Sequence, residues 1–202
     1  MSASTSVFHV LNNKVIPAAD YLRNGIQVSG DGSTVKGNFV EGAFLTPDWG
    51  STGILAVNAS DIVIENNEVS GDLIGLDMGI GILNYSVPSI DNIKILNNVI
   101  HGADYSLDVS ANSGTISGVL INENKITDYI EPIWAGIYGG GISVAQVDAT
   151  LNWWGSACGP TGPVTGDVVY SPWYIDDTMT ATASGEIGAY VFPTDSLTST
   201  MN

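Results

Sequence analysis

The 202-residue chain has few basic side chains, with five Lys and Arg against 21 Asp and Glu, and its formal net charge is −16. This balance excludes a nucleic-acid partner bound through phosphate neutralisation, because such binding needs clustered Lys and Arg. It also disfavours docking on anionic lipid. Charged residues make up only 13% of the chain and hydrophobic residues 44%, so a packed core is expected rather than disorder throughout.

Cysteine and long apolar runs are equally scarce. Cys158 is the only cysteine, so no disulfide can form within the chain. No apolar run approaches the roughly 20 residues of a membrane span, and the first residues lack the basic and apolar regions of a signal peptide. The composition, rich in Asn, Thr, Ser and Gly, favours an extracellular or cell-surface protein whose signal is absent from this chain. Asn58 and Asn84 stand in sequons and are candidate glycosylation sites.

A short phrase ending in asparagine recurs along the chain at spacings of 25, 29, 31, 26 and 28 residues. In the first five copies an aliphatic residue stands three positions before this asparagine and another stands two positions after it. Such columns of like residues predict a coil that completes one turn per copy, because a single turn cannot bury its own inner face. The six marker asparagines are Asn13, Asn38, Asn67, Asn98, Asn124 and Asn152.

A second set of short β-branched runs, which begin near residues 25, 53, 81, 106 and 141, alternates with these phrases. No segment has a sustained helical periodicity. We therefore predict an all-β, single-stranded parallel β-helix of about six coils, with strands about 4.8 Å apart. The marker asparagines should form a ladder at a sharp bend, since asparagine tolerates the left-handed conformation and its amide can bond to the copies above and below. An ordinary β-sandwich with chance Asn-Asn turns is the alternative.

The phrases IVIENNEVSG at 62–71 and IKILNNVIHG at 93–102 resemble the repeat of the pectin-lyase-like superfamily. The segment LNWWGSACGP at 151–160, followed by VYSPW at 169–173, is similar to the terminal segment of many secreted β-helix proteins. The resemblance covers roughly residues 7–175 and implies a right-handed coil, as parallel crossovers generally are. It implies no particular activity, because the superfamily holds lyases, hydrolases, epimerases, adhesins and scaffolds.

The two ends of the coil differ in sequence. We expect residues 1–175 to form the β-helix, including a Trp-rich cap at about 147–175 that closes the C-terminal end. Residues 176–202 read as a Thr/Ser-rich linker and an apolar tail strand. The expected cap residues are Trp153, Trp154, Pro172 and Trp173, and the expected assembly residues are Val7, Phe8 and Val10 at the start and Ile187, Tyr190, Val191 and Phe192 in the tail.

These ends suggest a non-enzymatic extracellular structural protein, of a surface-layer, filament or adhesin type. Its partners would be copies of itself, bound head to tail or by addition of the tail strand. The paired aspartates, Gly-His-Gly element and Arg-x-Lys element of pectin-type hydrolases are absent, so no catalytic residue is assigned. His and Cys are too few and too scattered for a soft-metal site.

The alternative hypothesis is a carbohydrate-active or carbohydrate-binding β-helix, a polysaccharide hydrolase or lyase in type. The longest apparent insertions, at 43–52, 72–79 and 129–140, are where such a coil would place its function. Trp49, Trp134 and Tyr138 would stack on sugar rings. Asp72, Asp104 and Asp128 follow their markers by four to six residues and would act as acids or hold calcium, the one cofactor considered. Solvated turn carboxylates are the simpler interpretation of these three.

Overall fold

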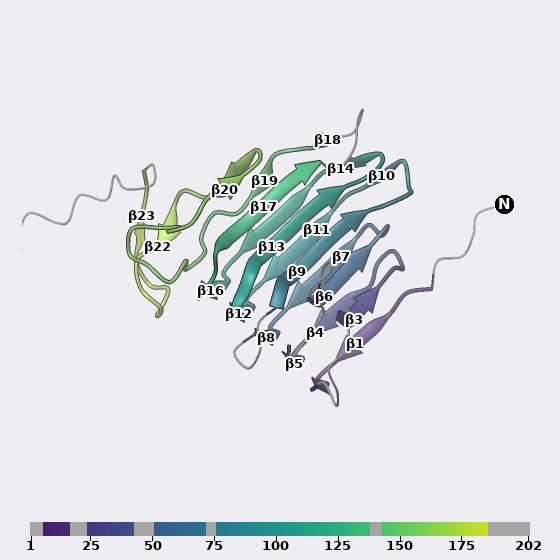
Figure 1. The fold of residues 1–202 in the computed structure, drawn as a ribbon, viewed down its shortest axis with the longest axis horizontal. Helices are drawn as coiled ribbons and strands as arrows, with labels where there is room; N and C mark the ends of the chain where they lie inside the picture. Colours follow the sequence, from purple (N-terminus) through teal and green to yellow (C-terminus); the bar gives the residue numbers. More distant parts are fainter. Residues whose placement is uncertain (1–5, 17–23, 43–50, 72–75, 138–142, 186–202) are drawn as a thin grey trace, which may run out of the picture.

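The chain folds into a parallel β-solenoid of about five turns, one fewer than the six coils predicted. The computed structural model describes residues 6–16, 24–42, 51–71, 76–137 and 143–185. Strands of successive turns lie side by side along the coil axis (Figure 1). Within those ranges there is no helix, and hence none long and apolar enough to cross a membrane. Six markers enclose only five intervals, which explains the difference in the number of turns.

Four parallel sheets form the walls of the coil, and we name them A to D. Sheet A contains β1 (His9–Leu11), β4 (Thr34–Lys36), β7 (Ile62–Glu65), β11 (Ile93–Leu96), β15 (Val119–Asn122), β19 (Val147–Asp148) and β21 (Val168–Val169). Sheet B contains β2 (Lys14–Val15), β5 (Phe39–Glu41), β8 (Glu68–Ser70), β12 (Val99–His101) and β16 (Lys125–Thr127). Sheet C contains β3 (Asn24–Val28), β6 (Thr52–Val57), β9 (Leu76–Asn84), β13 (Ala103–Ala111), β17 (Glu131–Ile137) and β20 (Val164–Thr165). The short sheet D contains β10 (Ser89–Ile90), β14 (Thr115–Ile116) and β18 (Ser143–Val144).

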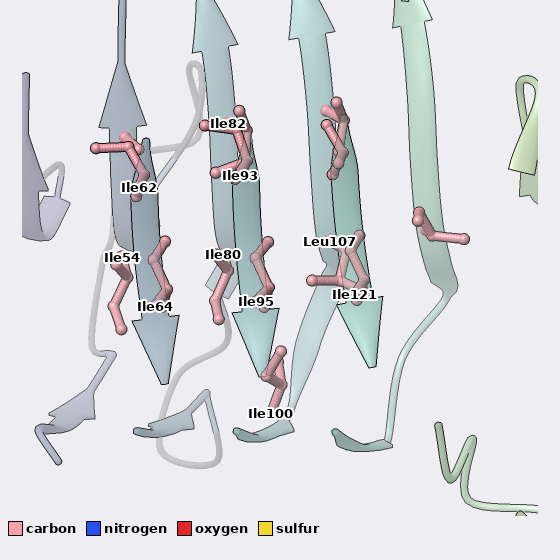
Figure 2. Close-up of a cluster of buried hydrophobic side chains, with 14 of the residues drawn as sticks. Ile54, Ile62, Ile64, Ile80, Ile82, Ile93, Ile95, Ile100, Leu107 and Ile121 are labelled. Atoms are coloured by element: carbon pink, nitrogen blue, oxygen red, sulfur yellow. The ribbon is translucent and has the colours of Figure 1, made fainter. Parts of the chain in front are cut away.

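Equivalent aliphatic residues stack on one another inside the coil. On sheet A, Ile64 pairs with Ile95 and Ile95 with Ile121, and all three are fully buried. The facing row on sheet C includes Ile54 and Ile80, and Figure 2 shows the two rows of side chains between the strands. Each such side chain contributes about 1.5–3 kcal/mol through burial. Stacking of turns therefore makes the core, because each inward residue is covered by its copies above and below.

The marker asparagines form one continuous column between sheets A and B. The backbone N–H and the side-chain Nδ2 of each marker both donate to Oδ1 of the next marker, at 2.9–3.0 Å, from Asn13 through to Asn152. Nδ2 also donates to a backbone carbonyl of the preceding turn; Asn98, for example, bonds to the oxygen of Ile64. Every buried amide in the column thus has partners, as burial of polar groups requires.

The left-handed residue at this bend is the one before each marker, and the expectation that the marker itself adopts this conformation is wrong. Asn66 and Asn97 both have φ of 55°, and Gly37 occupies the same position at 66°. The marker side chain has to point into the column. The preceding residue, which faces solvent, therefore adopts the left-handed conformation that the bend requires. A second left-handed position lies six residues before the marker, at Asp61 and Asn92 among others. Each sheet A strand is therefore bracketed by two tight bends in these turns.

One strand assignment from the sequence is also wrong. The sequence groups the run near 141 with the runs near 25, 53, 81 and 106, which lie in sheet C, but its strand β18 pairs with β14 in sheet D. The sheet C strand of that turn is β17, which pairs with β13 and lies in a stretch that the sequence suggested was an insertion. Pro132 is unusual within a strand, because proline has no backbone N–H for the ladder. On its far side β17 pairs with β20 only over Ile133 and Trp134, so the missing N–H of Pro132 falls outside that pairing.

The Trp-rich segment continues the coil with a shorter turn of 21 residues. Val147 of β19 pairs with Val168 of β21, and Trp153 bridges sheet B between Lys125 and Tyr174. Trp173 is fully buried, and its indole N–H donates to the Ala157 carbonyl at 3.1 Å. Part of the segment read as a linker then forms β23 (Thr182–Ala183), which pairs antiparallel with β22 (Trp173–Tyr174). This pairing covers the last strand of the coil.

Candidate functional site

A groove of about 590 Å³ lies on the outer face of sheet C, within the range of roughly 300–1,000 Å³ that is typical of ligand sites. It crosses β3, β6, β9 and β13, which are neighbours in Figure 1, and therefore runs along the coil axis. The three spacings between these four strands give the groove a length of about 14 Å. The lining residues are Asn24, Gln27, Thr52, Leu55, Val57, Met78, Gly81, Ile82, Leu83, Tyr85, Asp108, Ser110 and Asn112.

The floor of the groove depends on a glycine. Gln27, Leu55, Gly81 and Asp108 are aligned in register across four strands. They alternate with inward residues such as Ile80, so their row faces outward. A Cβ at Gly81 would lie 2.9 Å from Cδ1 of Leu55. The missing side chain therefore makes room for Leu55 in the floor of the groove, beside the position that pairs with Asp108.

Asp108 is the chemically distinctive group of the groove. Only 6% of this residue is exposed, and the Ser110 hydroxyl donates to its carboxylate. Burial, and secondarily the negative charge of Glu131, raise the pKa of Asp108 to about 7. The group can therefore hold or release a proton near neutral pH, which an ordinary surface aspartate cannot do.

A second carboxyl group stands on the next strand. Glu131 of β17 pairs in register with Tyr105 and is 9% exposed, and its Oε1 has no hydrogen-bond partner. Trp134, also on β17, lies directly opposite Asp108. Glu131 and Trp134 do not line the groove, so they lie behind its acidic end rather than inside it. Two neighbouring carboxyl groups in unequal surroundings are the usual starting point for acid–base chemistry.

The predicted acid cluster does not coincide with this groove. Asp104 and Asp128 are both exposed, and neither lines it. In the part of the chain that the structure describes, no three His, Cys, Asp or Glu side chains gather into a metal-binding group. Asp72 lies outside the described residues, as do Trp49 and Tyr138. Of the predicted stacking residues, only Trp134 is placed, and it adjoins Asp108 without entering the groove.

Those predicted assembly and cap residues that the structure describes lie at the two ends of the coil. Val7 and Phe8 are exposed, whereas Val10 is half-buried against the core. The tail residues Ile187, Tyr190, Val191 and Phe192 lie outside the described residues. Among the cap residues, Trp154 and Trp173 are buried, Trp153 is half-buried and Pro172 is exposed.

The two sequons differ in their access to solvent. Asn84 is fully buried, and its Nδ2 donates to the Thr115 carbonyl at 3.1 Å, so the folded chain does not present this nitrogen for glycosylation. Asn58 is half-buried, and its Nδ2 donates to Ser86 at 3.2 Å.

Sequence reasoning missed the groove residues Gly81, Tyr85, Asp108 and Ser110, and it missed Glu131, which lies behind them. The sequence contains a partial signal for two of these residues, Asp108 and Ser110. The run of Leu107, Asp108, Val109 and Ser110 alternates apolar and polar, which places both polar side chains on the face opposite the core. The alignment of Gly81 with Asp108 depends on the length of the connection between β9 and β13, which no local pattern fixes.

The architecture and the groove together define the class of protein as a parallel β-solenoid with an acidic surface groove. Comparison with family models, with curated proteins and with solved structures finds no match for this chain.

Proposed function

We propose that this chain is a glycan-binding β-solenoid and that the groove on sheet C is its binding site. The observation that carries the proposal is the acidic end of the groove, which Asp108 and Ser110 line beside Gly81. Carboxyl and hydroxyl groups can donate and accept hydrogen bonds with sugar hydroxyls. Leu55 and Met78 supply apolar surface, and the exposed ring of Tyr85 supplies a face on which a sugar ring can stack.

The acidic end also suits chemistry on the bound chain. Hydrolysis of a glycosidic bond uses one carboxyl group that keeps its proton near neutral pH and a second carboxyl group nearby. Asp108 meets the first condition, since its pKa is raised to about 7, and Glu131 is a second carboxyl group on the adjoining strand, outside the groove. Asp108 is thus the proton donor in any cleavage that accompanies binding.

The repeat phrases support the assignment of the chain to a superfamily. They resemble those of the pectin-lyase-like superfamily, and the stacked parallel turns agree with that fold, so we propose membership of this superfamily. An extracellular or cell-surface location follows from the same proposal and from the acidic, Asn- and Thr-rich composition.

Substitution of Gly81 by Val tests the site directly. The added side chain would meet Cδ1 of Leu55, so it should displace Leu55 into the groove and abolish binding, while a β-branched residue suits a strand. The measurement is affinity electrophoresis of the chain in gels containing xylan, β-glucan, mannan or pectin. We expect at least one polysaccharide to retard the native chain and the same gel to leave Gly81→Val unretarded.

The matched control is Ser89→Val, which adds the same side chain at an exposed position of β10, outside the groove. It should be retarded like the native chain, and thermal unfolding should show that both variants are folded. If no polysaccharide retards the native chain, or if Gly81→Val binds as well as Ser89→Val does, the proposal fails.

Self-association is a second candidate function, and the N-terminal strands favour it. Four of the nine exposed large apolar side chains of the described residues lie within residues 7–16. They are Val7, Phe8, Leu11 and Ile16, with exposed fractions between 43% and 54%. Clustered apolar surface at the edge of a sheet favours contact with another chain, and we propose a second copy of this one as the partner.

The double substitution Phe8→Ser with Leu11→Ser is expected to lower the average mass that light scattering measures at micromolar concentration. It removes apolar surface from the N-terminal cluster without touching the core, because both side chains are exposed. Ile130→Ser is the control, since Ile130 is 68% exposed but lies outside this cluster. A mass that stays the same in the double variant, or that falls equally in the control, would count against assembly through these strands.

A further inference from the structure

Among the described residues, the charges around the groove on sheet C are of one sign. No Lys, Arg or His occurs in any strand of sheet C, and none lines the groove. The four lysines that the structure places lie on sheets A and B, and Lys36 is already paired with Glu65 at 2.7 Å. Arg23 lies outside the described residues. A ligand seated in the groove therefore meets no placed cation.

The carboxyl groups of Asp108 and Glu131 disfavour the binding of an anionic ligand in the groove. Asp108 stands at its end, and Glu131 lies behind Asp108 with an unpartnered, buried oxygen. An anionic ligand group beside Asp108 would lie near the negative charge of Glu131 where water is partly excluded, and it would also oppose release of the Asp108 proton, because juxtaposed like charges repel each other. The net charge of −16 acts in the same direction at longer range.

The remaining polar groups are neutral. Asn24 and Gln27, which are hydrogen-bonded to each other at 2.7 Å, lie towards the N-terminal end of the groove. Thr52 and Asn112 supply a further hydroxyl and amide. Amides and hydroxyls can match the mixed donors and acceptors of sugar hydroxyls without requiring a charge on the ligand.

We propose that the groove binds uncharged glycan chains, which lie along the coil axis, and rejects chains that carry carboxylate or sulfate groups. This inference rests on the proposed function and names its substrate class. The length of the groove, across four strands, suits a chain of several sugars rather than a single ring.

Hexagalacturonate and its methyl ester provide the test, because the two chains share a backbone and differ in charge. Cellohexaose and xylohexaose complete the neutral set. Isothermal titration calorimetry of the full chain, in calcium and separately in EDTA, should show a neutral chain binding at least about tenfold more tightly than hexagalacturonate. The titration in calcium is needed because a calcium ion that bridged the protein and hexagalacturonate would reverse the preference for neutral chains.

Gln27→Lys adds a gain-of-function arm. It places a cation in the groove and should raise the affinity for hexagalacturonate, whereas Thr115→Lys, at an exposed position of β14 outside the groove, should not. Binding of hexagalacturonate as tightly as its methyl ester, with or without calcium, would overturn the inference and leave glycan binding intact. If none of the chains binds, the proposed function itself fails and the inference falls with it.

Discussion

Asp108→Asn is expected to stabilise the folded chain at pH 8 by up to about 4 kcal/mol. The pKa of Asp108 rises from 3.8 to about 7 on folding, and each unit corresponds to about 1.4 kcal/mol. Between these two values the folded chain holds a proton that the unfolded chain has released. Stability therefore falls as the pH rises through this window, by at most about 1.4 kcal/mol per unit, and the loss is complete above pH 7.

The asparagine side chain removes this loss without removing the local contacts. Its Oδ1 can still accept the Ser110 hydroxyl, and its size matches that of aspartate. The measurement is urea unfolding of both chains between pH 5 and 8.5, above the sequence pI of 4.1. The difference between the two free energies of unfolding isolates Asp108 from the other 20 acidic residues.

Two further variants test which residues cause the pH dependence of stability. Asp104→Asn, at an exposed position of the same strand, should leave the pH profile of the native chain unchanged. Glu131→Gln removes the smaller of the two causes of the raised pKa, so the fall in stability should move to lower pH but persist. Native and Asp108→Asn profiles that run parallel would show that the carboxyl group is not held protonated.

The coil could be predicted from the sequence because its signals are local and repeated. Each marker asparagine fixes a bend, and the aliphatic residues at fixed distances from it fix which side chains face inward. Ile64, Ile95 and Ile121, for example, align in the structure as their offsets from the markers require. Stacking then follows, since like residues cover like residues in successive turns.

The groove could not be predicted in the same way. Its row of Gln27, Leu55, Gly81 and Asp108 contains four different residue types, so no column of like residues marks it. Its alignment depends on connections of unequal length between sheets B and C. The strand that carries Glu131 also contains Pro132, and because proline is unusual within a sheet, the sequence pattern does not predict a strand there. Asp108 also stands between buried neighbours, where a carboxyl group is not expected.

Asn98→Ala is expected to destabilise the coil by about 3–5 kcal/mol. The Oδ1 atom of Asn98 accepts both the backbone N–H and the Nδ2 of Asn67, and its Nδ2 donates to Ile64 and to Asn124. Alanine leaves the backbone N–H of Asn67 unsatisfied, which costs about 1–3 kcal/mol, and removes one hydrogen bond from each of the other three groups, at about 0.5–1.5 kcal/mol each. Urea unfolding of the native chain and the variant measures the difference.

Position in the column decides the size of this effect. Asn13 stands at the exposed N-terminal end, so Asn13→Ala should cost about 1 kcal/mol or less. Asn97 precedes the marker, faces solvent and has φ of 55°, so Asn97→Gly should be nearly neutral and Asn97→Ala should cost about 1 kcal/mol from backbone strain alone. Equal losses at Asn13 and Asn98 would mean that the column does not hold the turns together. A larger loss at Asn97 than at Asn98 would mean that the bend, rather than the ladder of amides, carries the stability.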